Sequence, residues 1–337
     1  MLLAGPAGSL FALGPATRCI DLWGSAKVLK VVLVPTASFG AVIGLANTAL
    51  QLSLILFLWG LLQGSLDISA NAQAAAIESK SHRSVFSSMH GFWSLGALCG
   101  AGIGTMVVAT GLTISSEYLM LGLLGCAAVV PLSSPLLQGD IGKSARFRGS
   151  KPGRGGMAVL IVLGLIAFNT ALAEGAVADW SAVYLRDVLA VSPARAGLAF
   201  GAYSLGTLVG RAVGDPLVNR LGRVRAIQLG SGISSTALTC GLAIPQPISA
   251  ITGFAGLGLG LGCVLPAVYG MSSRTTSSLA LVTLFGWMGF VAGPPVIGLL
   301  ADTLGLSKAL WVVVGTSAAT ALLVGVAGQL SRDRPGS

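Results

Sequence analysis

The chain has 337 residues, of which only 9% are charged and 54% are hydrophobic, with a formal net charge of +9 and a mean hydropathy of +0.85. Soluble globular domains carry roughly 25% charged residues, so this composition excludes a water-soluble domain. The apolar runs do not alternate with polar residues at period two, which excludes a transmembrane barrel. An all-α polytopic membrane protein is the class that remains.

Eleven apolar stretches are long enough to cross a membrane, for which a helix needs about 20 residues. The least distinct boundary falls between the second and third stretches, where only Asn47, Thr48 and Gln51 indicate a turn. In chain order, the predicted spans are 1–16, 28–46, 51–78, 88–112, 117–138, 157–185, 193–214, 226–244, 247–271, 277–300 and 307–329.

The basic residues predict which side of the membrane each loop faces. Seventeen of the 20 Lys and Arg residues follow the odd-numbered spans, and the exceptions are Arg186, Arg195 and Lys308. Cytoplasmic loops are enriched in Lys and Arg. We therefore expect the central linker and the C-terminus in the cytoplasm and residue 1 outside, in a cell inner membrane. This bias explains the net charge without nucleic acid, and the five cysteines lack metal-type spacing.

One long hydrophilic stretch divides the chain into two helical bundles. The predicted domains are an N-terminal bundle of five spans at 1–138, a flexible linker at 139–156, a C-terminal bundle of six spans at 157–330 and a cytoplasmic tail at 331–337. The two bundles echo each other weakly. A glycine-basic loop at 24–27 corresponds to 214–225, and a glycine-rich segment at 91–96 corresponds to 286–294. Transporters commonly show internal symmetry of this kind.

Four motifs give this pattern a family resemblance. They are GDPLVNRLGRVR at 214–225, GSLDISANAQAAAIE at 64–78, SSMHGFWSLG at 87–96 and AEGAVADWSAVYL at 173–185. The first resembles the signature loop of the major facilitator superfamily. Together they resemble its YbjJ-like bacterial inner-membrane branch, which is similar to fucose-permease-like sugar transporters. The resemblance implies a major-facilitator fold with two pseudo-symmetric bundles.

That fold has twelve helices with both ends in the cytoplasm, whereas eleven are predicted here. The predicted arrangement is therefore five plus six, without a first helix, and the signature loop of the first bundle is degraded over 14–27. Two explanations stay open. Either the start site is set too late, or the chain is a decayed copy.

Charged side chains inside a membrane are costly and are usually functional. In the third span, Gly60, Gly64, Asp67, Asn71 and Glu78 fall within about 60° of one another on a helix. We expect the two glycines to let another helix approach closely. Asp67 and Asn71 are candidates for binding a proton or substrate, and the alternative is a structural bond to a neighbouring helix. Glu78 is a candidate gating residue, although a structural role is the leading interpretation.

The fourth and sixth spans supply the other candidate binding residues. His90 begins the fourth span, where it serves as a proton relay or as a polar anchor. Asn169, Thr170 and Glu174 lie in the sixth span. Glu174 suits a carboxyl group that takes up and releases a proton, and the alternative is a hydrogen-bonded structural residue. Asp179, near the outer boundary, is a candidate gating residue beside the interfacial Trp180.

The signature loop over 214–225 predicts a gate. We expect Asp215 to pair with Arg220 or Arg223, or to meet the N-terminus of a neighbouring helix, and so to hold the inward gate shut. A role in topology alone is the alternative. The glycine run at 256–262 superficially resembles a dinucleotide loop. It lies inside an apolar span, however, so tight helix packing is the better interpretation.

The leading functional prediction is a secondary transporter that moves a small polar organic solute by alternating access, as a proton symporter. No enzyme motif is present. The expected partners are a small-molecule substrate, protons and the lipid bilayer, with no cofactor, metal or nucleic acid, and we expect a monomer. Two alternatives stay open. One is a drug or metabolite efflux transporter, and the other is a truncated non-transporting remnant or membrane sensor.

Overall fold

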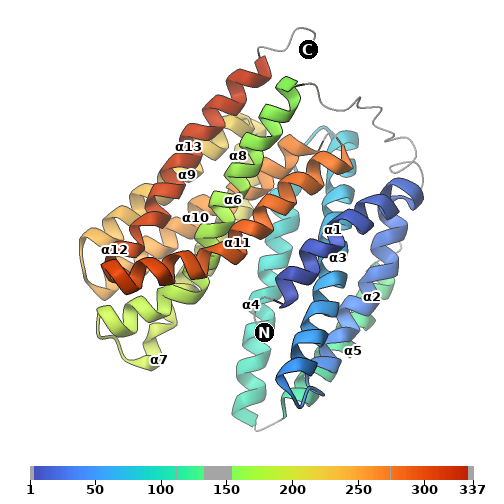
Figure 1. Ribbon diagram of the computed structural model, residues 1–337, viewed down its shortest axis with the longest axis horizontal. Coiled ribbons are helices and arrows are strands. Elements are labelled where there is room, and N and C mark those ends of the chain that lie inside the picture. The colour runs from blue at the N-terminus through green and yellow to red at the C-terminus, as the bar shows by residue number, and fades with distance from the viewer. Residues whose placement is uncertain (1–3, 111–112, 133–153, 274, 333–337) are drawn as a thin grey trace. The chain divides into compact units, whose positions relative to one another are not determined.

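The computed structural model describes residues 4–110, 113–132, 154–273 and 275–332, and nearly all of them lie in helices (Figure 1). Most of the predicted linker at 139–156, and residues 333–337 of the predicted tail, lie outside the described residues. The all-α fold class is confirmed. Eleven described helices have 19 residues or more: α1 (Ala4–Trp23), α2 (Ser25–Ile43), α3 (Ala49–Ser81), α4 (Phe86–Thr110), α5 (Ile114–Leu132), α6 (Arg154–Val183), α8 (Leu198–Leu221), α9 (Arg223–Ala243), α10 (Pro247–Ser272), α11 (Thr276–Leu304) and α13 (Trp311–Arg332).

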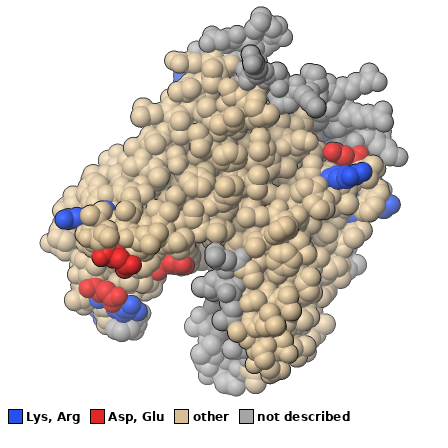
Figure 2. All heavy atoms as spheres, in the orientation of Figure 1, with Lys and Arg blue, Asp and Glu red and all other residues tan. Residues whose placement is uncertain are grey.

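Each long helix corresponds to one predicted span. Three short elements accompany them: the π-helix η1 (Tyr184–Val188), α7 (Pro193–Ala196) and α12 (Leu306–Ala309). Among the described helical segments, six are long and apolar enough to cross a membrane by length and composition. Most of the molecular face in Figure 2 is formed by residues that are neither basic nor acidic, as a lipid-facing surface requires.

The chain forms two compact units, and α4 and α11 each pass from one to the other. The first unit comprises Met1–Ser81, Leu95–Gly149 and Ser273–Ala280. The second comprises His82–Ser94, Ser150–Ser272 and Leu281–Ser337. The first five residues of α11 and most of α4 thus belong with the N-terminal helices, whereas the first nine residues of α4 pack within the second unit.

In the first unit, α1 and α3 touch backbone to backbone. A Cβ atom placed on Gly60 would collide with the carbonyl oxygen of Gly5, and one on Gly64 would collide with the backbone of Ser9. The Ser9 hydroxyl donates a hydrogen bond of 3.0 Å to the Gly60 carbonyl oxygen. The predicted close approach of another helix at Gly60 and Gly64 is therefore confirmed, because small residues permit it.

In the second unit, glycines on two faces of α10 contact two different helices. Cβ atoms on Gly258 and Gly262 would collide with backbone oxygens of α8, and one on Gly260 would collide with the carbonyl oxygen of Gly230 in α9. Gly256 faces Ala237 of α9. The glycine run is thus a packing element, as predicted, and α10 lies between α8 and α9.

Single glycines separate the two helix pairs that the weak sequence repeat related. Gly24, between α1 and α2, has φ 87°, and Gly222, between α8 and α9, has φ 80°. Non-glycine residues rarely adopt this conformation. The sequence interpretation of a loop over 14–27 is therefore wrong, because α1 continues to Trp23. The signature segment before Gly222 is likewise helical, because its side chains pack against the unit.

Candidate functional site

A buried arginine is the centre of the site. Arg211 lies within α8 and is only 4% exposed, so its guanidinium is removed from bulk solvent. It belongs to a polar stripe at four-residue spacing, Tyr203, Thr207, Arg211 and Asp215, and all four members are buried. Four-residue spacing places side chains on one face of a helix. From the sequence, Arg211 is counted among the basic residues that follow the seventh span, whereas the structure places it inside α8.

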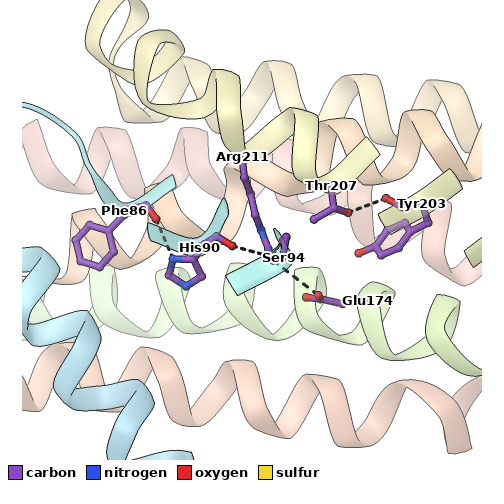
Figure 3. Close-up of polar contacts among 7 residues, drawn as sticks. All are labelled: Phe86, His90, Ser94, Glu174, Tyr203, Thr207 and Arg211. Carbon is purple, nitrogen blue, oxygen red and sulfur yellow. Dashed lines mark hydrogen bonds and ion pairs between the residues drawn. The ribbon is translucent and has the colours of Figure 1, made fainter. Parts of the chain in front are cut away.

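Arg211 has partners on two helices other than its own (Figure 3). Its Nη2 lies 3.8 Å from Oε1 of Glu174 on α6. Its Nη1 donates to the His90 carbonyl oxygen at 3.2 Å and to the Ser94 hydroxyl, both on the first turns of α4. The guanidinium carbon lies 5.4 Å from the centre of the Trp93 ring, a cation–π distance. Residues of α4 and α6 therefore converge on a cation that α8 carries.

The guanidinium is not fully satisfied. Nε of Arg211 is buried and has no hydrogen-bond partner among the residues that the structure describes. The 3.8 Å separation from Glu174 is an ion pair that is too long for a hydrogen bond. Buried donors are nearly always paired in proteins. An unpaired Nε beside a loosely held Nη2 is therefore a feature that needs a functional explanation.

Two of the predicted binding residues, Glu174 and His90, are brought together by this cluster. The Glu174 side chain is 23% exposed and faces Arg211. His90 contributes its carbonyl oxygen to Arg211, while its Nδ1 bonds the Phe86 carbonyl oxygen at 2.9 Å. The His90 ring lies 5.6 Å from the Tyr269 ring of α10. The imidazole is therefore held in place from two sides.

The other predicted residues of α6 have different surroundings. Thr170 is buried and its hydroxyl donates to the Ile166 carbonyl oxygen of its own helix at 2.9 Å. Asn169 is half-buried, and Asp179 is exposed. Trp180, interpreted as interfacial, donates from Nε1 to the Pro294 carbonyl oxygen of α11 at 2.9 Å. Of the α6 candidates, Glu174 is the one whose ion pair joins two helices.

The candidates of the third span lie in the first unit. Nδ2 of Asn71 donates to Oδ1 of Asp67 at 3.0 Å, one helical turn away, and Asn71 is buried. Asp67 is half-buried. Glu78 is 9% exposed, near the end of α3. A neighbouring bond joins Gln73 Nε2 to the Ser25 hydroxyl of α2 at 2.8 Å.

Asp215 meets the N-terminus of α4, one of the two partners predicted for it. Its Oδ1 accepts from the Ser84 hydroxyl at 2.9 Å and the Ser87 amide at 3.1 Å. Its Oδ2 accepts from the Ser88 amide at 2.8 Å and the Ser88 hydroxyl at 2.5 Å. A carboxylate here satisfies free backbone N–H groups and complements the helix dipole. Asp215 is thus an N-terminal cap supplied by another helix.

The two signature arginines lie apart from this cap. Arg220 is exposed, in the last turn of α8. Arg223 is half-buried, and its guanidinium occupies the space that a side chain at Gly270 would need. Chemically, the described site therefore offers a positive charge with one acidic neighbour, several hydroxyl groups and aromatic rings. Groups of these kinds are able to bind polar solutes and exchange protons.

Comparisons with known proteins agree with this architecture. Residues 157–336 match the family model described as the Major Facilitator Superfamily. An uncharacterised transporter, y4wD, of Sinorhizobium fredii is 30% identical, with 97% of this chain and 87% of that protein covered. An uncharacterised MFS-type transporter of Yersinia pestis is 28% identical, with 92% and 81% covered.

Solved structures share the fold. The transporter FucP in its outward conformation aligns with a TM-score of 0.78 at 14% identity, over 96% of this chain and 88% of FucP. The human organic anion transporter MFSD10 aligns with a TM-score of 0.77 at 17% identity, over 96% and 83%. The narrower resemblance to the YbjJ-like branch stays a prediction. The chain belongs to the major facilitator superfamily, and it is a multi-pass membrane transporter, not an enzyme.

Proposed function

We propose that this transporter moves a small polar organic solute across the cytoplasmic membrane by alternating access, together with a proton carried by Glu174. The observation that carries the proposal is the ion pair between Glu174 and Arg211 inside the second unit. An ionised carboxylate within apolar helices is costly unless a cation compensates it. Protonation of Glu174 therefore changes the state of Arg211, and this dependence couples a proton to the site.

The coupling also requires that Glu174 reach water. Its side chain is 23% exposed whereas that of Arg211 is 5% exposed, so the acid is the more accessible member of the pair. His90, held beside the cluster, is a candidate relay. Transporter fold neighbours include one described as the E. coli fucose:proton symporter, FucP, with a TM-score of 0.73 at 16% identity. That likeness supports a fold compatible with proton symport.

Asp67 and Asn71 form the corresponding polar pair of the first unit in this proposal. Their bond at 3.0 Å places a carboxylate and an amide, both of which bind solute hydroxyl groups, one helical turn apart on α3. Asn169 and Thr170 extend the solute site on α6.

The gate in this proposal is the cap that Asp215 places on α4. The contact ties the signature segment of α8 to a helix that continues into the first unit. We propose that the cap breaks and re-forms during each transport cycle. Three further gating residues act at the cytoplasmic ends of their helices: Arg220, Arg223 and Glu78. Asp179 acts near the outer, C-terminal end of α6.

Uptake into proteoliposomes tests the proton step. Purified wild-type protein, Glu174→Gln and the control Asp302→Asn, an exposed acid of α11, are compared with and without an inward proton gradient, on a panel of sugars, polyols and organic acids. Gln preserves size and hydrogen bonding but does not change charge. We expect proton-driven accumulation by wild type and Asp302→Asn, and only equilibration by Glu174→Gln. Accumulation by Glu174→Gln would show that Glu174 is structural.

A further inference from the structure

We propose that the transported solute carries a carboxylate, and that this group binds the Nε–Nη2 edge of Arg211 when Glu174 is protonated. The inference rests on the proposed function and specifies its substrate class. It follows from three features of the Arg211 site: the distribution of its hydrogen bonds, the fixed plane of its guanidinium and the local balance of charge.

The hydrogen bonds of Arg211 leave one edge available. Nη1 is engaged by Ser94 and by the His90 carbonyl oxygen. Nε is buried without a partner among the described residues, and Nη2 has Glu174 at a distance beyond hydrogen bonding. Nε and Nη2 together present two parallel N–H donors, whose spacing matches the two oxygens of a carboxylate. Glu174 approaches this edge without engaging both donors.

The guanidinium is also held in one orientation. Trp93 lies 5.4 Å from the guanidinium carbon, and Ser94 and the His90 carbonyl fix the opposite end of the group. These contacts come from consecutive turns of α4. A planar donor pair held in place loses little freedom when a ligand binds, which favours affinity. The site is therefore preorganised for a planar anion.

The charge balance determines when a carboxylate can bind. The titratable groups beside Glu174 and Arg211 are His90 from α4 and Tyr203 from α8, and Tyr269 from α10 contacts the His90 ring. Asp215, one turn along α8, is engaged by the N-terminus of α4. The sequence of α10 contains no charged residue, and in α11 and α13 the charged residues are Asp302 and Arg332, near the ends of those helices.

Arg211 therefore has Glu174 as its nearby counter-ion within the described residues. An incoming carboxylate would place two negative charges beside one positive charge, and like charges side by side cost several kcal/mol. A proton on Glu174 removes this penalty and frees the edge of Arg211. One proton and one carboxylate then enter together and leave together. The moving complex is electroneutral, so the pH gradient drives it and the membrane potential does not.

Formate is the probe for this site, because it is the smallest carboxylate and needs no knowledge of the rest of the solute. Thermal unfolding of the purified protein in detergent is measured in sodium formate and in sodium chloride at the same concentration. Formamide serves as the uncharged analogue. The variants are wild type, Glu174→Gln and the double variant Glu174→Gln with Arg211→Gln. We expect formate to stabilise Glu174→Gln with an apparent affinity at least about tenfold tighter than for wild type at pH 7.5.

Formamide is expected to give no stabilisation, and the double variant is expected to lose the formate effect. A second measurement needs no variant: formate affinity for wild type should tighten as the pH is lowered, because a proton on Glu174 frees the edge of Arg211. A formate effect equal to that of chloride in both measurements, or one that persists without Arg211, would overturn the carboxylate site. Because these measurements involve no transport, their failure is separable from failure of the uptake assay.

Discussion

The contact between Asp215 and the start of α4 predicts how strongly the Asp215→Asn substitution destabilises this end of the helix. In Asp215→Asn, the amide carbonyl can replace Oδ1 and still accept from Ser84 and Ser87. The amide nitrogen then stands where Oδ2 accepted from Ser88, so it faces the Ser88 backbone N–H and that bond is lost, whereas the Ser88 hydroxyl can turn and accept from the amide. The substitution also removes the negative charge that complements the N-terminus of α4.

The expected cost follows from these two losses. The lost hydrogen bond from the Ser88 N–H to a charged carboxylate contributes about 2 kcal/mol, and the charge at a helix terminus contributes about 1 kcal/mol more. The α4 N-terminus should therefore open more easily by about 3 kcal/mol, which is about a hundredfold in the opening equilibrium. Asp302→Asn, which removes an exposed acid from the same unit, should change stability by less than about 0.5 kcal/mol.

Hydrogen exchange measured by mass spectrometry provides the assay. Amides at Ser87 and Ser88 should exchange about a hundredfold faster in Asp215→Asn than in wild type, while peptides from α10 should change far less. The melting temperature in detergent should fall as well. If Asp215→Asn exchanged at the rate of Asp302→Asn over residues 84–90, the cap would contribute nothing to the position of α4, and the gating proposal would lose its structural basis.

Three further predictions concern packing and topology. Gly60→Ala should destabilise the protein by about 1–3 kcal/mol in thermal unfolding, because its Cβ atom would meet the Gly5 backbone. The control is Gly100→Ala, since the space around Gly100 is open. Equal melting temperatures of the two variants would contradict the α1–α3 contact. Gly214→Ala should speed exchange at the start of α4, because its Cβ atom would meet Ser87, whereas Gly201→Ala in the same helix should not. Ser144→Cys in the central linker should resist a membrane-impermeant thiol reagent in intact cells, and labelling from outside would reverse the predicted topology.

The sequence predicted the helices well because their signal is local. An apolar run of about 20 residues is sufficient evidence for a spanning helix, and no distant contact is needed to recognise it. The packing role of the glycines of α3 and α10 is also predictable from the sequence, since regular spacing of small residues indicates where a neighbouring helix approaches. The predicted loop over 14–27 is wrong because α1 continues through Pro15 to Trp23.

The site was only partly accessible to sequence reasoning. Glu174 and His90 were selected because intramembrane polar residues are rare, but their common partner was missed. Arg211 was counted among cytoplasmic charges because it stands near the end of an apolar run. Its four-residue spacing from Thr207 and Asp215 was the available signal. The partner of Asp215 was named only as one alternative, because Ser88 lies 127 residues away in the chain and no local pattern predicts that contact.

The glycines on two faces of α10 also bear on how the protein is made. Each interior glycine disfavours a helix by about 1 kcal/mol relative to alanine, so a segment with glycine at 256, 258, 260 and 262 is a weak helix when isolated. Its partners α8 and α9 both precede it in the chain and are synthesised first. When α10 leaves the ribosome, both helices that contact its glycines have therefore already been synthesised. The chain order therefore supplies this glycine-rich helix after both of its partners have been synthesised, so moving the α10 segment ahead of α8 should impair biogenesis.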